Sequence, residues 1–323
     1  MRVSIIIPNW NGREILRACV ESCLSQDYGS FEVIVIDNGS LDGSTDLDIL
    51  VSSRVRVIQL DQNVGFGRAV NIGMRHSQAE YVFLLNNDTT VAPDALVQLV
   101  LVADAKRQYD FFAPSILDWN APDTLYAAGV MFSRRGYGNR SQRHTISANP
   151  LEREVFGFCG AAVLIRKAAI DDVGDFNEHF FLMAEDVELS YRLQLRGHQG
   201  LFVPHSRVSH RGSATLRKIF PVVVEQSIRN AIIVLFTCVP ASHLRRIWAG
   251  SVKFYVHLSF AIVKRGWWRE WLGAIAWILL HIPWMIRRRM ALQSGSHLDE
   301  QRLWSLLYDG VIEINFDDGV LRL

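Results

Sequence analysis

Short strand patterns alternate with helical patterns over the first third of the chain. Apolar, strand-forming runs occupy Val3–Ile7, Phe31–Ile36, Val55–Leu60 and Tyr81–Leu85, and between the first two, Arg13–Gln26 repeats its apolar residues at helical spacing. The alternation continues to about residue 105. This order of elements is typical of a doubly wound α/β fold with helices on both faces of a mainly parallel, Rossmann-like sheet.

Polar residues follow two of these strands directly. Asp37 ends the second strand, and the fourth runs into Asn86, Asn87 and Asp88 in the stretch YVFLLNNDTTV. In an open α/β sheet, ligands bind beyond the carboxyl ends of the parallel strands, so these side chains are candidates for holding a metal or a charged substrate. The alternative is a plain turn and helix start, because Asn, Asp and Thr favour turns and Pro93 suits a first helical position.

The pattern changes after residue 110. Strands are predicted in FFAPSIL and LYAAGVMF, and the polar, Arg- and Gly-rich span Ser133–Glu154 is predicted to be one long mobile loop. Phe156–Ile165 is apolar and glycine-spaced, which allows close approach of the backbone to another group. A helix is predicted in the second half of Phe176–Gly197, and it begins near the acidic pair Glu185–Asp186. Gly200–His210 is predicted as a further strand.

Residues 222–290 form helix-length apolar stretches interrupted by basic residues and tryptophans. Trp271–Ile286 has no formal charge, but His281 and Pro283 interrupt it and it is short for a membrane crossing. Trp and Arg at both margins favour helices that lie in the headgroup layer. The alternatives are core helices that pack on the sheet domain or on a second copy of the chain, and a true span.

The change from alternating strand and helix patterns to long apolar helical stretches predicts two domains, residues 1–215 and 216–323. The second is expected to be a helical, membrane-associating region, and the alternating tail Val311–Leu323 with its Asp-Gly turn predicts a terminal hairpin.

Composition narrows the function classes. The chain has 323 residues, 49% of them hydrophobic, which is ample for a core, and its net charge of +1 does not indicate a globally basic nucleic-acid binder. The four cysteines form no CxxC pair or zinc-like spacing, which favours reduced packing thiols in a cytosolic protein. The start MRVSIIIP is predicted to be the first strand and not a signal peptide.

Three other enzyme classes lack their motifs. Gly65 and Gly67 are followed by Val70 where a dinucleotide fingerprint needs a third small residue, and GxxxxGK[ST] does not occur. The nucleophile elbow GxSxG is also absent. An NAD enzyme, a P-loop NTPase and a serine hydrolase are therefore disfavoured.

Five ordered motifs carry a family resemblance over about Met1–Gly212. They are SIIIPNWNG, VIVIDNGSLDGS, NVGFGRAVNIG, FLLNNDTTV and AEDVELSYRLQLRG. In this order the sequence resembles the family 2 glycosyltransferases with the GT-A fold, and within them the rhamnosyltransferase-like members that build bacterial surface polysaccharide.

The resemblance implies a nucleotide site. Pro8 and Asn9 would line the nucleotide, and Asp37 would accept a hydrogen bond from the pyrimidine ring. The glycine-opened helix of NVGFGRAVN could bring its N-terminus toward the donor phosphates, while tight packing is the alternative role for its glycines. The remaining expected nucleotide contacts are Asn38, Gly65, Arg68, Asn71, Asn86 and Asn87.

The resemblance also implies a metal and a base. Asn86–Asn87–Asp88 stands where the family has a DxD-type motif, and only its last acid is present here. Mg²⁺ or Mn²⁺ would bind Asp88, with His210 either a second ligand or a structural residue. Asp186 matches the general base of the family's ED motif, and Glu185 would position substrate or tune the pKa of Asp186.

The function implied is an inverting glycosyltransferase. It would move a sugar, with L-rhamnose favoured, from a dTDP- or UDP-linked donor to a glycan or polyprenyl-linked glycan, as a peripheral protein on the cytoplasmic face of the inner membrane. Two alternatives remain open at this point, a non-catalytic GT-A-like membrane scaffold and a metal-dependent nucleotidyltransferase.

Overall fold

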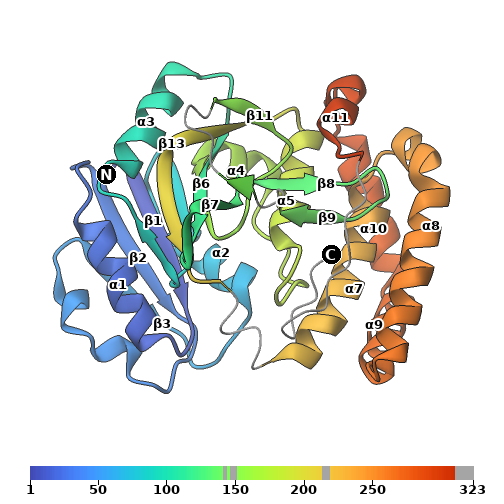
Figure 1. Ribbon diagram of the computed structural model, residues 1–323, viewed down its shortest axis with the longest axis horizontal. Helices are drawn as coiled ribbons and strands as arrows, with labels where there is room; N and C mark the ends of the chain where they lie inside the picture. Colours follow the sequence, from blue (N-terminus) through green and yellow to red (C-terminus); the bar gives the residue numbers. More distant parts are fainter. Residues whose placement is uncertain (141–143, 146–150, 213–218, 310–323) are drawn as a thin grey trace.

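The computed structural model describes residues 1–140, 144–145, 151–212 and 219–309. It shows a mixed sheet with helices on its faces and a group of C-terminal helices beside it (Figure 1). The main path of the sheet is β10-β7-β6-β12-β4-β1-β2-β3, and β13 joins it through β6. The strands are β1 (Val3–Asn9), β2 (Phe31–Asp37), β3 (Val55–Gln59), β4 (Tyr81–Leu85), β5 (Thr89–Val91), β6 (Phe111–Asp118), β7 (Ala121–Ala127), β8 (Val130–Phe132), β9 (Gly138–Arg140), β10 (His144–Thr145), β11 (Arg153–Val155), β12 (Ala162–Arg166) and β13 (Gly200–His210).

The helices fall into two groups. Those of the sheet region are α1 (Arg13–Leu24), α2 (Phe66–His76), α3 (Ala95–Ala105), α4 (Lys167–Val173) and α5 (Glu185–Leu195). Those of the C-terminal region are α7 (Phe220–Cys238), α8 (Ala241–Lys264), α9 (Trp268–Leu280), α10 (Ile282–Ser294) and α11 (Glu300–Leu306).

The first four strands form the parallel part of the sheet, as predicted. β1 lies between β2 and β4, β3 flanks β2, and Asn9 is in register with Asp37. Such strands are covered by helices on both faces, which explains their near-continuous apolar runs. Parallel pairing brings the polar ends of β1 and β2 to one edge of the sheet.

The other half of the sheet is mixed. β12 runs antiparallel to both β4 and β6, while β13 is parallel to β6 and antiparallel to β5 and β11. The regular alternation of strand and helix patterns ends near residue 105, so the sequence pattern supported only the parallel half. The pairing of β13 with β5 places His210 opposite Thr89, next to the end of β4.

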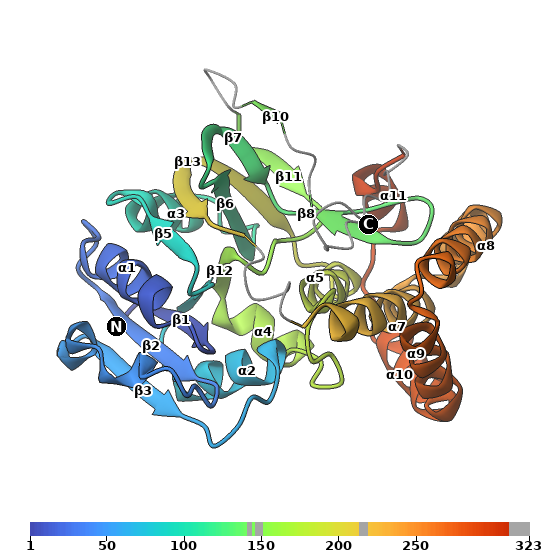
Figure 2. The same ribbon diagram turned by 60° about the horizontal axis from the view of Figure 1, so that its bottom comes forward.

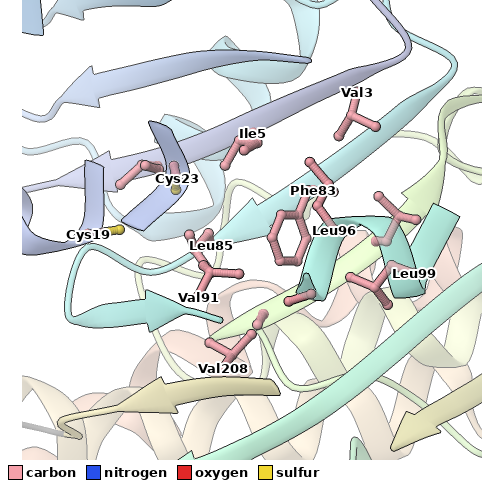
Figure 3. Close-up of a cluster of buried hydrophobic side chains, with 14 of the residues drawn as sticks. Val3, Ile5, Cys19, Cys23, Phe83, Leu85, Val91, Leu96, Leu99 and Val208 are labelled. Carbon is pink, nitrogen blue, oxygen red and sulfur yellow. The ribbon is translucent and has the colours of Figure 1, made fainter. Parts of the chain in front are cut away.

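Two apolar layers hold the sheet region together. Alternate residues of a strand face opposite sides of the sheet, so Ile5 packs with Phe83 under α1 and α3, while Ile6 packs with residues of α2 on the other face. Cys19 and Cys23 lie in the first layer and are unoxidised, buried packing residues (Figure 3). Each large apolar side chain buried in this way contributes about 1.5–3 kcal/mol.

The C-terminal helices form a separate group beside the sheet. α7 packs on α5 of the sheet region and on α9 and α10, and α8 lies at the outer edge (Figure 2). The predicted interruption of Trp271–Ile286 is confirmed, since α9 ends at Leu280 and α10 begins at Ile282 with Pro283 in its first turn.

One local prediction is wrong. Ser133–Glu154, expected to be a single irregular loop, contains β9, β10 and the start of β11 in its described part. Strands of two or three residues are too short to show an alternating pattern. The predicted hairpin Val311–Leu323 and the boundary at residues 215 and 216 lie outside the described residues.

Candidate active site

A cavity of about 300 Å³ lies at the carboxyl ends of the parallel strands. Its walls come from the ends of β1, β2 and β4, from the starts of α2 and α5, and from the end of β13. The residues that line it are Pro8, Asn9, Trp10, Asn38, Asn63, Gly65, Phe66, Asn86, Asn87, Asp88, Tyr126, Cys159, Gly160, Ala161, Phe181, Leu182, Met183, Glu185, Asp186, His210 and Ile219. Most of the residues predicted for the site therefore share one cavity.

The ends of β1, β2 and β4 are joined by side-chain hydrogen bonds. The Asn87 amide donates to Asn9 Oδ1 at 2.7 Å, and Asn9 Nδ2 donates to Asp37 Oδ1 at 3.1 Å. The backbone N–H of Ser40 donates to the other oxygen of Asp37. Asp37 therefore does not line the cavity itself but lies behind Asn9 and fixes its amide.

Asn38 and Gly65 connect the end of β2 to the start of α2. Asn38 Nδ2 donates to the Gly65 carbonyl at 3.2 Å, and Asn38 Oδ1 accepts from the N–H of Val64. Gly65 has φ of 90°, and a Cβ at this position would lie 2.7 Å from the Phe181 carbonyl oxygen. Only glycine meets both conditions without strain.

Two residues predicted to contact the donor lie away from the cavity lining. Arg68 is exposed and forms an ion pair with Glu178 at 3.5 Å. Asn71 is fully buried, and its amide group bonds to the backbone N–H and carbonyl of Phe176. Helical geometry explains both positions, because the inner face of α2 packs on the sheet and only the first turn of the helix reaches the cavity.

Asp88 and His210 meet on one wall of the cavity. Their side chains are 3.1 Å apart between Asp88 Oδ1 and His210 Nε2, and the His210 ring packs edge-on against Tyr126. Two buried polar atoms here, His210 Nδ1 and Asn86 Oδ1, have no hydrogen-bond partner, and Asp88 Oδ1 makes no hydrogen bond besides its close approach to His210 Nε2. Unpartnered buried oxygen and nitrogen atoms are costly unless a ligand completes them.

These donors fit a divalent cation that shares its coordination with substrate. In the described part of the chain, no group of three or more His, Cys, Asp or Glu side chains is arranged to hold a metal. Asp88 and His210 would supply two ligands, and phosphate oxygens and water the rest. A nitrogen ligand suits Mn²⁺ better than Mg²⁺, because Mg²⁺ prefers oxygen.

Glu185 and Asp186 form the wall on the side of α5. The Asp186 carboxylate accepts from the backbone N–H groups of Gly160 at 3.0 Å and Val187 at 2.8 Å. Glu185 Oε2 has no partner. The close packing predicted for the glycine-spaced segment Phe156–Ile165 is confirmed, because a Cβ on Gly157 would lie 2.4 Å from the Ser190 side chain.

Glu185 and Asp186 differ in how strongly their surroundings favour the protonated form. Burial, and secondarily the charge of Asp186, raises the pKa of Glu185 to about 8. Burial also raises the pKa of Asp186, against the opposing effect of its two backbone N–H donors. Those donors favour the ionised form of Asp186, and Glu185 Oε2 has no such donor, so Glu185 is the acid of the pair that more readily keeps a proton.

Several lining residues had not been predicted. They are mostly apolar or aromatic; Phe66 begins α2, Tyr126 lies in β7, and the others come from turns or loops, namely Trp10, Asn63, Phe181, Leu182, Met183 and Ile219. One available signal was the run FFLM, one residue before the acidic pair, because exposed turns seldom carry four apolar residues in succession.

The fold and this cavity define an α/β protein with a cleft at the strand ends, where ligands of open α/β sheets bind. A family model described as "Glycosyl transferase family 2" matches residues 4–174, and the chain belongs to this family. The protein is thus a family 2 glycosyltransferase. The match ends before Glu185, Asp186 and His210.

Similar proteins agree with this assignment. The N-acetylglucosaminyl-diphospho-decaprenol L-rhamnosyltransferase of Mycobacterium tuberculosis is 26% identical over 291 residues, which cover 81% of both chains. An uncharacterised protein of Sinorhizobium fredii is 29% identical over 66% of this chain, and the chain spans only 25% of that protein. O-antigen biosynthesis protein RfbC of Myxococcus xanthus is 27% identical over 67% of this chain, which spans 18% of it.

Two solved structures share the fold. GalNAc-T7 with UDP, GalNAc and Mn²⁺ superposes with a TM-score of 0.59 at 19% identity, covering 73% of this chain and 48% of that one. Staphylococcus aureus TarS superposes with a TM-score of 0.57 at 15% identity, covering 95% and 50%. The predicted GT-A architecture is confirmed, with a mixed sheet.

Proposed function

We propose that this protein transfers a sugar, with inversion, from a nucleoside-diphosphate donor to a hydroxyl of a glycan or lipid-linked glycan. One observation carries the proposal: Asp88 and His210 on one wall, and Glu185 and Asp186 on another, line the same cavity. This is the arrangement expected when one wall holds a diphosphate and the other holds the attacking hydroxyl.

Binding a diphosphate in this cavity requires positive charge that the described lining residues do not supply. Asp88, Glu185 and Asp186 line the cavity, and no Lys or Arg of the described residues does. Asp88 and His210 would hold Mn²⁺ or Mg²⁺, which, when bound, neutralises the negative charge that gathers on the leaving nucleotide. Asn9, Asn38, Asn86 and Asn87 supply neutral amides that would orient the nucleotide without adding charge.

The acceptor end requires a base. An acceptor hydroxyl is a weak nucleophile until a positioned carboxylate takes its proton. Asp186 would accept that proton as the hydroxyl oxygen bonds to the anomeric carbon from the face opposite the departing nucleotide. Gly160 and Val187 hold the carboxylate in place through their N–H groups. Burial favours the protonated form of Glu185 beside it, so Asp186 is the acid of the pair better suited to act as the carboxylate base.

A pyrimidine nucleotide donor, dTDP- or UDP-linked, follows from the family resemblance. The Mycobacterium relative is named for transfer of L-rhamnose to a decaprenol-linked acceptor, and on that basis L-rhamnose is our preferred sugar and a polyprenyl-linked glycan our preferred acceptor. A role in bacterial surface polysaccharide synthesis is consistent with both.

The outer helices offer a surface for the membrane that carries such an acceptor. On α8 the apolar residues Trp248, Val252, Val256 and Phe260 are exposed at every fourth position, so they share one face. Exposed apolar residues continue on α9 and α10 with Trp268, Leu272, Leu279, Leu280, Ile282, Ile286 and Met290. Large exposed apolar patches mark interaction sites.

Charge favours an anionic lipid surface over a second protein chain as the partner. Between Pro240 and Met290 the sequence has nine Lys or Arg residues and one acid, Glu270. Seven of these basic residues are exposed, namely Arg245, Arg246, Lys253, Lys264, Arg265, Arg269 and Arg287. A basic, Trp-rich, apolar face is suited to the headgroup layer, whereas in a homodimer the same charges would face each other.

A peripheral position is our proposal for the membrane association. α7 is the only helix in the described ranges that is long and apolar enough to cross a membrane, and 61% of its apolar stretch is buried against the rest of the protein. A buried helix of this kind supports the sheet region. The cytoplasmic face of the inner membrane, where nucleotide sugars are available, is the position we propose.

A thermal-shift panel tests the proposal. UDP- and dTDP-linked sugars are titrated in the presence of Mn²⁺, of Mg²⁺ or of EDTA, because a ligand that binds only the folded state raises the melting temperature. The expected result is a shift with one nucleotide-sugar class that requires the metal, followed by transfer from that donor. A protein that no nucleotide sugar stabilises with either metal contradicts the proposal.

A further inference from the structure

The turn before α5 has an unusual backbone. Met183 and Ala184 both have positive φ, 70° and 62°, although neither is glycine. The left-handed conformation brings Cβ close to the following carbonyl oxygen, so two such residues in succession are strained. This turn leads directly into Glu185 and Asp186, and Met183 itself lines the cavity. Strained turns of this kind persist only where the surroundings hold them.

Asn230 of α7 holds this turn. Its side chain is fully buried, and Nδ2 donates to the carbonyl oxygens of Leu182 at 2.9 Å and Met183 at 2.8 Å. Both amide hydrogens are thus used on two successive carbonyls of the strained segment. A chain that returned to ordinary φ values would rotate these carbonyls away from Asn230.

Arg229 fixes the amide from the other side. Its Nε donates to Asn230 Oδ1 at 3.1 Å, which sets the orientation of the amide, and its Nη2 donates to the His179 carbonyl at 2.7 Å. The guanidinium group also stacks on Trp277 of α9 at 4.4 Å. The clamp, meaning Asn230 together with Arg229, therefore links the turn to the C-terminal helices.

We propose that Asn230 is a positioning residue for the Glu185–Asp186 pair, so that the C-terminal helical region completes the active site in addition to its surface role. The inference rests on the proposed function in that Asp186 is taken as the base. Without the two amide donors, the turn relaxes toward right-handed or extended values and the first turn of α5 shifts, carrying the Asp186 carboxylate with it. Displacements of about 1 Å in a reacting group cost about a hundredfold in rate.

Kinetics on Asn230→Asp and Asn230→Ala test this role. Asn230→Asp keeps the shape but removes both donors. The expected result is a loss of kcat of about a hundredfold, with metal-dependent binding of UDP or dTDP changed by less than about twofold, since Asp88 and His210 lie on another wall. The matched control is Ser227→Ala, a buried hydroxyl one turn away on α7 without a hydrogen-bond partner, which should leave kcat unchanged.

The Asn230→Ala substitution can also be tested in a protein that carries Ala184→Gly. This keeps the proposal testable if the single variants fold poorly. Glycine adopts positive φ freely, so Ala184→Gly should reduce the dependence on Asn230. We expect the factor by which Asn230→Ala lowers kcat to be at least about threefold smaller in the Ala184→Gly background than in the wild type. The loss of thermal stability should also be smaller in that background. Strictly additive effects overturn the proposal, as does wild-type kcat in both single variants.

Amide hydrogen exchange tests the role of Asn230 independently of the proposed transfer activity. The N–H groups of Val187 and Glu188 are protected by Asp186 Oδ1 and by the Ala184 carbonyl. Their exchange should accelerate in Asn230→Ala and not in Ser227→Ala, whether or not a donor has been found. Unchanged exchange contradicts the clamp. A wild type without transfer activity contradicts only the proposed function.

Discussion

The sheet region and the C-terminal helices use their apolar residues in opposite ways. In the sheet region most large apolar side chains are buried, and exposed ones are scattered, as at Leu41 and Val51. On α8, α9 and α10, exposed apolar residues recur along each helix. The first arrangement produces a rigid sheet with polar strand ends, and the second leaves a surface that requires a partner.

The inner face of the C-terminal helices makes polar contacts with the sheet region. Its buried polar residues do not bond among themselves alone but reach into the sheet region, as Asn230 does toward the turn before α5. Arg288 of α10 likewise pairs with Glu188, a fully buried residue of α5 that also bonds to Arg192 at 2.8 Å. The helices therefore have an exposed apolar outer side and a mainly apolar inner side, and a few buried polar residues on the inner side bond to α5 and to the turn before it.

The largest expected effect is at the proposed base, Asp186. Asp186→Asn keeps the size of the side chain but removes its ability to take a proton, and its amide oxygen can accept from only one of the N–H groups of Gly160 and Val187. We expect transfer to fall by about 10³-fold, while binding of UDP or dTDP with Mn²⁺ is retained. A radiolabelled-sugar transfer assay measures the first quantity and calorimetry the second. Retained turnover would remove Asp186 from this role.

A smaller effect is expected where the two regions meet. Glu188→Gln leaves Arg192 and Arg288 without their buried counter-charge, and we expect a loss of about 3 kcal/mol in the free energy of unfolding. Chemical denaturation measures it. The control is Asp171→Asn, which removes only an exposed pair with Lys167 and should cost less than about 0.5 kcal/mol. Equal effects would mean that the buried link is unimportant.

The ion pairs of Glu188 also make the stability of the protein depend on pH. Burial raises the pKa of Glu188, but the charges of Arg192 and Arg288 outweigh burial and lower it overall. A carboxyl whose folded pKa is depressed contributes stability above its unfolded pKa, which is lost as pH falls through the folded value. Glu188→Gln should therefore flatten the stability curve below about pH 4.5, the unfolded value of Glu.

The smallest effect concerns the outer face. Phe260 is 69% exposed on α8, and Phe260→Glu puts a negative charge in the middle of the apolar series. We expect at least about tenfold weaker binding to vesicles that contain phosphatidylglycerol, with unchanged transfer to a water-soluble acceptor. Val51→Glu, at an even more exposed apolar position of the sheet region, is the control. Equal vesicle binding by all three proteins would contradict a membrane-facing role for α8.

The sequence predicted the parallel half of the sheet and most of the cavity for the same reason. Strand periodicity and polar strand ends are local signals: Asn9 and His210 end β1 and β13, and Asp88 follows the end of β4 by three residues. Arg68 and Asn71 were misplaced relative to the cavity because the orientation of α2 depends on its packing on the sheet. Asn230 gave no signal at all, since a polar residue within an apolar helix shows its role only once the turn Leu182–Ala184 lies beside it.

The most direct test of one shared cavity is calorimetric titration of UDP and dTDP into the wild type and Asp88→Asn, each with Mn²⁺ and with EDTA. Asp94→Asn, an exposed acid at the start of α3, is the control. We predict that Mn²⁺ strengthens nucleotide binding at least about tenfold in the wild type and in Asp94→Asn, and that Asp88→Asn abolishes this gain. Binding that is independent of metal, or unaffected by Asp88→Asn, would contradict the account.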